Sequence, residues 1–229
     1  MASLVVVPAV GVEQRWIFDP VLERLGRTDY ARTLQSMQAF TETRTADSAD
    51  RFWLTEHAPV YTLGLAGRRE HILRDNAIPV LKVDRGGQVT YHGPGQLVFY
   101  LLLDLKRLRL GVRQLVEAIE TAVIKLLDCY GIEAYGRRDA PGVYVKRGGR
   151  EFKVAALGLK VRNGCTYHGF ALNLDMDLAP FDDIDPCGYR GLAVTQLRDL
   201  GVRAPRREIE DRLVAYTTEA IAGSGRRAR

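Results

Sequence analysis

The sequence lacks a hydrophobic run long enough to cross a membrane. A spanning helix needs about 20 consecutive apolar residues, and no stretch of the 229 residues approaches that length. The apolar opening at residues 2–10 is interrupted by Pro8 and has no basic leading segment, so we do not expect a signal peptide. With 46% hydrophobic and 27% charged residues, the composition is typical of a soluble globular protein.

Cysteine is scarce, and its spacing excludes the usual metal motifs. The chain has three cysteines and four histidines, without a CxxC or HxxxH pair, so we predict no zinc site and no metal. An odd number of cysteines without a secretory signal favours free thiols in a reducing compartment. We therefore expect a cytoplasmic protein.

A strong charge imbalance is also missing. The net charge is +5, but three arginines lie in the last seven residues, so the rest of the chain carries only +2. Nucleic-acid binding normally requires a clustered basic face, and we expect neither a nucleic-acid nor a membrane partner. The mild charge would suit an acidic protein partner or simply a solvated surface with a basic tail.

Helical and extended patterns alternate along the chain without a repeat. Apolar spacing of three and four predicts helices at 28–44, at 112–130 and from Pro205 onward. Strands are expected at 51–57, 60–65, 80–84 and 97–105, followed by a hairpin and a further extended pair within 143–174. We predict an α+β fold, a largely antiparallel sheet flanked by helices, with one catalytic domain at 1–222. Residues 223–229 are expected to form a disordered basic tail.

The segment from Arg85 to Gln96 combines four glycines with many hydrogen-bonding side chains. Glycine permits positive φ and lets backbone approach a ligand closely. The segment matches neither GxGxxG nor GxxxxGK[ST], so it is not a common nucleotide loop. It indicates a binding loop, although a tight hairpin with incidental polar residues is the alternative. His92 has its own alternative, a core histidine bonded to backbone.

A second segment places Lys153 beside small and apolar residues. Alternation along a strand would put Lys153, Ala155 and Leu157 on one face. An amine above an apolar surface loses hydration, which favours the neutral form that a base requires. The alternative is a solvent-facing lysine on an edge strand, like Lys146 and Lys160, and spacing alone favours it.

Cys187 lies between Pro186 and Gly188 in an irregular stretch, where a thiol is open to approach. A reactive cysteine also needs a nearby cation or helix N-terminus to form the thiolate. Cys129, by contrast, lies in an apolar helical run. Cys165, three residues before His168, is a competitor, but its alternating surroundings indicate a strand and a structural role.

Together these segments resemble the lipoyl(octanoyl) transferase family, that is, octanoyl-[acyl-carrier-protein]:protein N-octanoyltransferases. The resemblance rests on HAPVYTLG, RGGQVTYHGPGQLVFY, APGVYV, KVAALGLKV, GCTYHGFALNL and PCGYRG with TQL, which cover about residues 57–197 in order. It implies the fold of lipoate-protein ligases and of the catalytic domain of biotin protein ligases.

The resemblance also implies a reaction in lipoate biosynthesis. An octanoyl group passes from octanoyl-acyl carrier protein to a lysine of a lipoyl domain, in 2-oxoacid dehydrogenase complexes or the glycine cleavage H protein. It places the nucleophile on Cys187 and its paired lysine, base or thiolate-stabilising cation, on Lys153. Substrate-binding positions fall on Arg85, Gly86, Gly87, Gln88, Val89, Thr90, Tyr91 and His92, on Ala156, Leu157 and Gly158, and on Gly169, Phe170 and Ala171.

The expected chemistry needs no cofactor, because exchange between thioesters is nearly isoenergetic. Cys187 would form an acyl-enzyme that divides the reaction into two steps, and Leu157 and Phe170 would line an apolar tunnel for the chain. Two other functions fit the same fold. An ATP-dependent lipoate-protein ligase would not need the cysteine, and a non-catalytic acyl-binding regulator would usually have lost Cys187 or Lys153.

Overall fold

The computed structural model describes residues 18–186 and 191–226; Cys187 therefore lies outside the described residues. Within them, the main sheet has eight strands in the order β1-β2-β6-β10-β9-β8-β7, with β11 paired to β9. The strands are β1 (Val21–Thr28), β2 (Arg51–His57), β6 (Gln96–Leu102), β7 (Ala134–Gly136), β8 (Gly142–Arg147), β9 (Arg150–Arg162), β10 (Cys165–Asn173) and β11 (Ala193–Val194). Among the described strands of this main sheet, only the β1–β2 and β11–β9 pairs are parallel.

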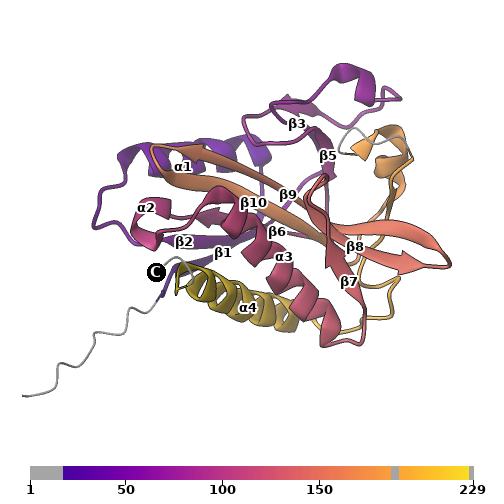
Figure 1. The fold of residues 1–229 in the computed structure, drawn as a ribbon. Helices are drawn as coiled ribbons and strands as arrows, with labels where there is room; N and C mark the ends of the chain where they lie inside the picture. Colours follow the sequence, from indigo (N-terminus) through magenta and orange to yellow (C-terminus); the bar gives the residue numbers. More distant parts are fainter. Residues whose placement is uncertain (1–17, 187–190, 227–229) are drawn as a thin grey trace, which may run out of the picture.

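A smaller sheet lies beside the main one. It has the order β4-β3-β5, with β3 (Val60–Leu63), β4 (Val80–Lys82) and β5 (Val89–His92). In Figure 1 the small sheet and α1 (Tyr30–Thr43) lie on one side of the main sheet. The predicted α+β fold with a largely antiparallel sheet is confirmed.

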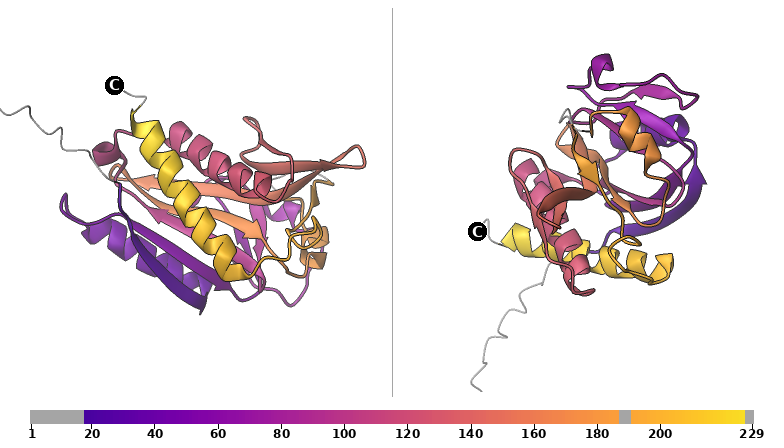
Figure 2. Two further views of the ribbon diagram at one scale, coloured as in Figure 1. Left: turned by 90° about the horizontal axis from the view of Figure 1, so that it is seen from below. Right: turned by 90° about the vertical axis from the view of Figure 1, so that its right-hand side faces the viewer.

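Two helices cover the opposite side of the main sheet, as Figure 2 shows. They are α3 (Val112–Asp128) and α4 (Arg206–Arg226). Apolar side chains of both helices are fully buried against the sheet, and they recur at the predicted helical spacing: Leu115, Ile119, Leu126, Ile209 and Leu213. Because α4 continues through Arg226, the helix runs four residues past the expected domain boundary at 222. Residues 227–229 lie outside the described part.

Several short elements were not predicted. They are β1, β7, β11, α2 (Leu105–Leu108) and the 3-10 turns at Arg69–His71 and Ala179–Asp183. Strand β1 is an edge strand with mostly exposed or half-buried side chains, and its pairing register shifts at Gly26, so it lacks regular hydrophobic alternation. None of the described helices is long and apolar enough to cross a membrane.

Candidate functional site

A cavity that is partly open to solvent lies between the main sheet and the glycine-rich segment. Its floor consists of two neighbouring rows of residues paired across β9, β10 and β6. The first row is Ala156, Ala171 and Val98, and the second is Gly158, Gly169 and Tyr100. Four of these six residues are alanine or glycine, so the floor leaves space where larger side chains would fill it.

The glycine-rich segment forms the roof of the cavity and contacts strand β9 beside the floor. The Gly86 N–H donates to the Leu159 carbonyl over 2.9 Å. A Cβ at Gly158 would lie 3.0 Å from the Gly86 carbonyl oxygen and 3.1 Å from Arg85 Cδ, so the close approach requires glycine there. The buried Arg85 guanidinium donates to the Thr62 carbonyl (2.7 Å) and hydroxyl (2.8 Å), which ties the roof to the small sheet.

The structure brings nearly all the predicted substrate-binding residues to this one cavity. The exceptions are Gly86 and Tyr91. Tyr91 packs instead against Tyr61 and Phe181, with ring centroids 5.6 and 5.5 Å apart. Burial in that cluster raises the pKa of Tyr91 to about 12.

The structure refines the picture of the expected apolar tunnel. Leu157 and Phe170 border the cavity, but both belong to the core cluster beneath α3 and α4, where Phe170 contacts Phe99 at 5.1 Å between centroids. Alternation along the strands turns them away from the floor residues Ala156 and Ala171. The room for a ligand therefore comes from small residues on the cavity face, not from the two large ones.

Lys153 reaches the cavity face through a β-bulge. Ala155 pairs with Val143 on β8, but the next pair joins Lys153 to Tyr144, so Val154 has no partner across the strands. A bulge of this kind reverses the alternation beyond it. Lys153 thus shares a face with Ala156 and not, as predicted, with Ala155 and Leu157.

Lys153 is a buried residue of an interior strand, with 3% of its surface exposed, so the interpretation as a solvent-facing edge lysine is wrong. Its Nζ donates to the Pro141 carbonyl over 3.2 Å and lies 5.1 Å from the Tyr144 ring centroid. A Cβ at Gly142 would lie 2.5 Å from Lys153 Cε, so that glycine makes room for the lysine. Burial raises the pKa of nearby Glu120, a shift that the Gly142 N–H and Lys153 partly offset.

Pro186, before Cys187, and Val194, seven residues after it, both lie next to Lys153. Pro186, which directly precedes Cys187, lines a second, smaller cavity together with Lys153. This cavity shares Thr90 and Ala156 with the larger one, so the two are adjacent. On the other side, Val194 pairs with Lys153, and the Thr195 N–H donates to the Lys153 carbonyl over 2.9 Å.

The other two cysteines lie away from Lys153. Cys165 pairs with Arg162 at the far end of β9, nine residues or about 30 Å from Lys153. It is buried, and burial raises its thiol pKa, which disfavours the thiolate. Cys129 is exposed at the end of α3, on the helical side of the sheet, with Sγ 3.0 Å from Tyr216 Oη.

Sequence reasoning missed four lining residues: Tyr30, Val98, Tyr100 and His168. Three of them carry polar groups buried at one end of the cavity. Tyr100 Oη lies 2.7 Å from His57 Nε2. Because His57 Nδ1 lies 3.0 Å from the Thr28 carbonyl, which can only accept, Nδ1 carries the proton and Nε2 accepts from Tyr100. Burial raises the pKa of Tyr100 well above its ordinary value, so the phenol stays neutral.

His168 is held by a carboxylate outside the cavity. Its backbone is left-handed, with φ +61°, and its Nε2 lies 2.9 Å from Asp84 Oδ1. Hydrogen bonds from His168 and Tyr167 lower the pKa of Asp84, while burial lowers that of His168. The imidazole is therefore neutral with its proton on Nε2, and Nδ1, an acceptor, has no partner within the part of the chain that the structure describes.

A chain of hydrogen bonds runs from His92 in the cavity to Thr195, the residue that follows β11 beside Lys153. Its Nδ1 donates to Gln96 Oε1 over 2.8 Å, and Gln96 Nε2 donates to Asn173 Oδ1 over 2.9 Å. Asn173 in turn donates to the Thr195 carbonyl. His92 is buried as the alternative interpretation expected, but its partners are side chains. Burial lowers its pKa well below the ordinary value.

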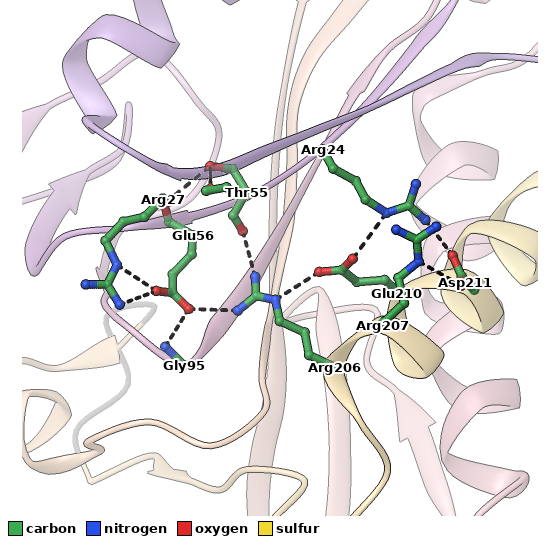
Figure 3. Close-up of polar contacts among 10 residues, drawn as sticks. Arg24, Arg27, Thr55, Glu56, Gly95, Arg206, Arg207, Glu210 and Asp211 are labelled. Atoms are coloured by element: carbon green, nitrogen blue, oxygen red, sulfur yellow. Dashed lines mark hydrogen bonds and ion pairs between the residues drawn. The ribbon is translucent and has the colours of Figure 1, made fainter.

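An ion-pair network anchors the turn that follows His92. Glu56 accepts from the Gly95 N–H (2.8 Å) and pairs with Arg206 (2.7 Å) at the start of α4, as Figure 3 shows. Arg206 also pairs with Glu210 on its own helix. The network fixes Gly95 against the C-terminal helix and so positions Gln96, the partner of His92. Among the described residues, no three His, Cys, Asp or Glu side chains are arranged to hold a metal ion.

The family follows from a match over most of the chain. The model of the lipoyl protein ligase A/B catalytic domain matches residues 29–218, and the chain belongs to this family. An octanoyltransferase of Dechloromonas aromatica is 60% identical over 202 residues, covering 88% of this chain and 97% of that protein. One of Laribacter hongkongensis is 56% identical over 201 residues, covering 88% and 95%. The predicted resemblance to octanoyltransferases, and with it the acyltransferase class, is confirmed.

Solved structures agree with the fold. A bipartite lipoate-protein ligase of Thermoplasma acidophilum superposes with a TM-score of 0.70 at 18% identity, covering 89% of this chain and 84% of that one. A biotin protein ligase of Aquifex aeolicus gives a TM-score of 0.52 at 14% identity, covering 92% and 72%. At these identities the likeness concerns the fold alone.

Proposed function

We propose that this chain transfers an octanoyl group from octanoyl-acyl carrier protein to a lysine of lipoyl domains, through a thioester on Cys187. The acceptors would be the lipoyl domains of 2-oxoacid dehydrogenase complexes and the glycine cleavage H protein, and the enzyme would act in the cytoplasm. The observation that carries the proposal is the position of Lys153. It is buried in the second cavity together with Pro186, which directly precedes Cys187, and it pairs with Val194, seven residues after Cys187. This cavity adjoins the one floored by small residues.

The first half-reaction would form the acyl-enzyme. Lys153 accepts the proton of the Cys187 thiol, and the thiolate attacks the octanoyl carbonyl of the carrier thioester. The bond from the carbonyl to the carrier sulfur breaks. The leaving thiolate takes the proton back from Lys153.

The second half-reaction would use the same groups. The acceptor lysine is protonated in water near neutral pH, so it first releases one proton to the solvent and attacks as the neutral amine. Lys153 takes a proton from the attacking nitrogen while the amide bond forms, and returns it to the departing Cys187 thiolate. A single base thus serves both steps, and no group is consumed.

The cavity supplies the binding energy for the alkyl chain of the octanoyl group. Burial of alkyl groups contributes about 0.8 kcal/mol per methylene, and the floor row from Ala156 to Val98 offers apolar surface that begins three residues beyond Lys153 on β9. The ATP-dependent ligase is the less supported alternative, because relatives at 52–60% identity over nearly their whole length are named octanoyltransferases.

Cysteine variants would test the nucleophile. We expect Cys187→Ser to lower the rate of transfer from octanoyl-acyl carrier protein to a lipoyl domain by about 1000-fold or more, because a hydroxyl replaces the attacking thiolate. Cys129→Ser and Cys165→Ser are the matched controls and should transfer within about threefold of the parent rate, since neither lies beside Lys153. A Cys187→Ser protein with normal turnover, or transfer that requires ATP, would contradict the proposal.

Lysine variants would test the base. Lys153→Met should lower the rate by about 100-fold or more, the usual contribution of general acid–base catalysis. Lys146→Met removes an exposed lysine of the same hairpin and should leave the rate unchanged. Equal rates for the two variants would exclude Lys153 from the reaction.

A further inference from the structure

The two cavities share a boundary. Among the described lining residues, only Thr90 of β5 and Ala156 of β9 border both cavities. The larger cavity would hold the alkyl chain, and the smaller one contains Lys153 and Pro186, the residue before Cys187. In a thioester on Cys187 the carbonyl joins the sulfur to the alkyl chain. The carbonyl would therefore lie at this boundary.

The amine of Lys153 extends to the same level of the sheet. Gly142 pairs with Ala156 across β8 and β9, and residues paired in this way lie about 5 Å apart between Cα atoms. A Cβ built on Gly142 would lie 3.0 Å from Lys153 Nζ. The amine thus lies beside this pair, although the lysine backbone is three residues away along β9. Base and boundary are close together.

Strand β5 directs the Thr90 side chain toward the cavities. The next residue, Tyr91, packs in the apolar cluster with Phe181. Alternation along the strand places Thr90 and His92 on the opposite face, and His92 lines the larger cavity. Because Thr90 is only 8% exposed, its hydroxyl is largely shielded from bulk water.

The Thr90 hydroxyl is the side-chain hydrogen-bond donor at the boundary. Ala156 contributes only a methyl group. The amides of Gln96 and Asn173, which line the smaller cavity, are held by one another and by the Thr195 carbonyl. Among the described residues, no such hydrogen bond holds the Thr90 hydroxyl. Its proton can therefore be donated to a ligand.

Acyl transfer needs a donor at this position. When a thiolate adds to a thioester carbonyl, negative charge develops on the carbonyl oxygen. A fixed donor in a site shielded from water stabilises that charge more than it stabilises the uncharged carbonyl, and its removal lowers kcat by about 100- to 1000-fold. The charge develops again when the acceptor amine adds to the acyl-enzyme. One donor could therefore serve both half-reactions.

We propose that the Thr90 hydroxyl donates a hydrogen bond to the octanoyl carbonyl oxygen and stabilises the oxyanion of both half-reactions. This inference rests on the function proposed above, and it adds a catalytic residue to Cys187 and Lys153. It requires that the hydroxyl of Thr90, and not the shape of its side chain, determines the rate of acyl transfer.

Single-turnover acylation by octanoyl-acyl carrier protein tests the hydroxyl. Thr90→Val removes it but keeps the branched shape, and the rate constant of acyl-enzyme formation should fall by about 100-fold or more. The carrier concentration that gives half the maximal rate should change by less than about threefold, because the lost interaction strengthens only in the transition state. Thr90→Ser keeps a hydroxyl and should stay within about tenfold of the parent rate.

Thr217→Val is the matched control. Thr217 is fully buried in α4, on the other side of the main sheet, and its hydroxyl has no partner within the described part of the chain. Its replacement should leave the acylation rate unchanged.

The acyl-enzyme also offers a spectroscopic readout. A hydrogen bond to a carbonyl oxygen lowers the stretching frequency of the carbonyl group. With an octanoyl group that carries carbon-13 at the carbonyl, the infrared band of the acyl-enzyme should therefore lie at higher frequency in Thr90→Val than in the parent protein. A purely structural role of Thr90 would not move this band.

Three results would overturn the oxyanion role. They are an acylation rate of folded Thr90→Val within about threefold of the parent rate, an equal loss of rate in Thr90→Ser, and an unchanged carbonyl frequency. If thermal unfolding shows that Thr90→Val does not fold, Thr90→Ala removes the same hydroxyl and should show the same loss. A parent protein that forms no acyl-enzyme on Cys187 would instead contradict the proposed function, so the two failures are distinct.

Discussion

The two faces of the main sheet differ in what they bury. The face under α3 and α4 is a continuous apolar core in which Phe99, Leu101 and Leu213 have no exposed surface. The cavity face carries small residues and neutral polar groups, such as Gly169 and Tyr100, at equivalent depth. We infer that one face supplies most of the stability and the other supplies the site.

Strand β6 contributes to both faces at once. Phe99 and Leu101 point to the helices, while Val98 and Tyr100 point to the cavity. All seven of its residues are buried, and after Gln96 the strand reads as a nearly unbroken apolar run. A buried strand can thus carry a site on alternate residues with no polar signal beyond Gln96 and one tyrosine.

The largest effect should come from the helix face. Leu213→Ala removes a fully buried side chain and should lower the free energy of unfolding by about 2–5 kcal/mol. Because the site lies on the other face, octanoyl transfer per folded molecule should not change. Denaturant titration and activity at matched folded concentration would check this, with Leu65→Ala, at a residue 63% exposed, as the control. A fall in transfer beyond the loss of folded protein would break the division between the faces.

On the other side of the comparison, a substitution at Gly142 should lower the transfer rate more than it lowers the stability. A Cβ there would lie 2.5 Å from Lys153 Cε and 2.7 Å from the Ala155 carbonyl, with φ at +147°. Gly142→Ala should therefore displace the lysine and lower the transfer rate by about 100-fold, which corresponds to about 2.7 kcal/mol. Its stability loss, about 1–3 kcal/mol, is that of backbone strain.

Gly148→Ala is the control for that strain. Gly148 also has positive φ, +56°, but a Cβ there meets nothing within 4 Å. This variant should lose about 1–2 kcal/mol of stability with no loss of transfer. If both alanine variants lost activity equally, the contact with Lys153 would not be the cause.

The smallest effect concerns pH. Burial lowers the pKa of His57, His92 and His168, so the folded protein binds protons on these side chains less readily than the unfolded chain does. Stability from this source is complete above the unfolded pKa of about 6.5 and is lost as pH falls below it. The free energy of unfolding should be lower at pH 5.5 than at pH 7.5 by about 1 kcal/mol or more. Equal values at both pH would mean that the cavity face tolerates charged imidazoles.

Much of the fold and part of the site could be predicted from the sequence. Long periodic segments such as α3, and the glycine-rich roof, carry local signals that survive in the structure. The bulge at Val154 could not be foreseen, because it depends on the partner strand β8. Strict alternation therefore placed Lys153 on the wrong face, whereas Ala156 and Gly158, which were expected to bind substrate, do line the cavity.

The polar end of the cavity was also beyond sequence reasoning. Tyr30, Tyr100 and His168 come from three distant segments, and each fits its own helix or strand pattern without a local peculiarity. Only the pairing of β6 with β10 and the position of α1 bring them together. Such a group of residues becomes visible only when the pairing of distant strands is known, and no single stretch of the sequence reveals it.

The central claim is that the acyl group forms a thioester with Cys187 while Lys153 accepts and returns the proton. The most direct measurement is intact-mass analysis of the protein after incubation with octanoyl-acyl carrier protein and no acceptor, followed by peptide mapping. We predict one added octanoyl group, on the peptide that contains Cys187, which disappears when a lipoyl domain is supplied. Absence of the adduct in a protein that transfers octanoyl at a normal rate, or an adduct on Cys129 or Cys165 instead, would contradict the account.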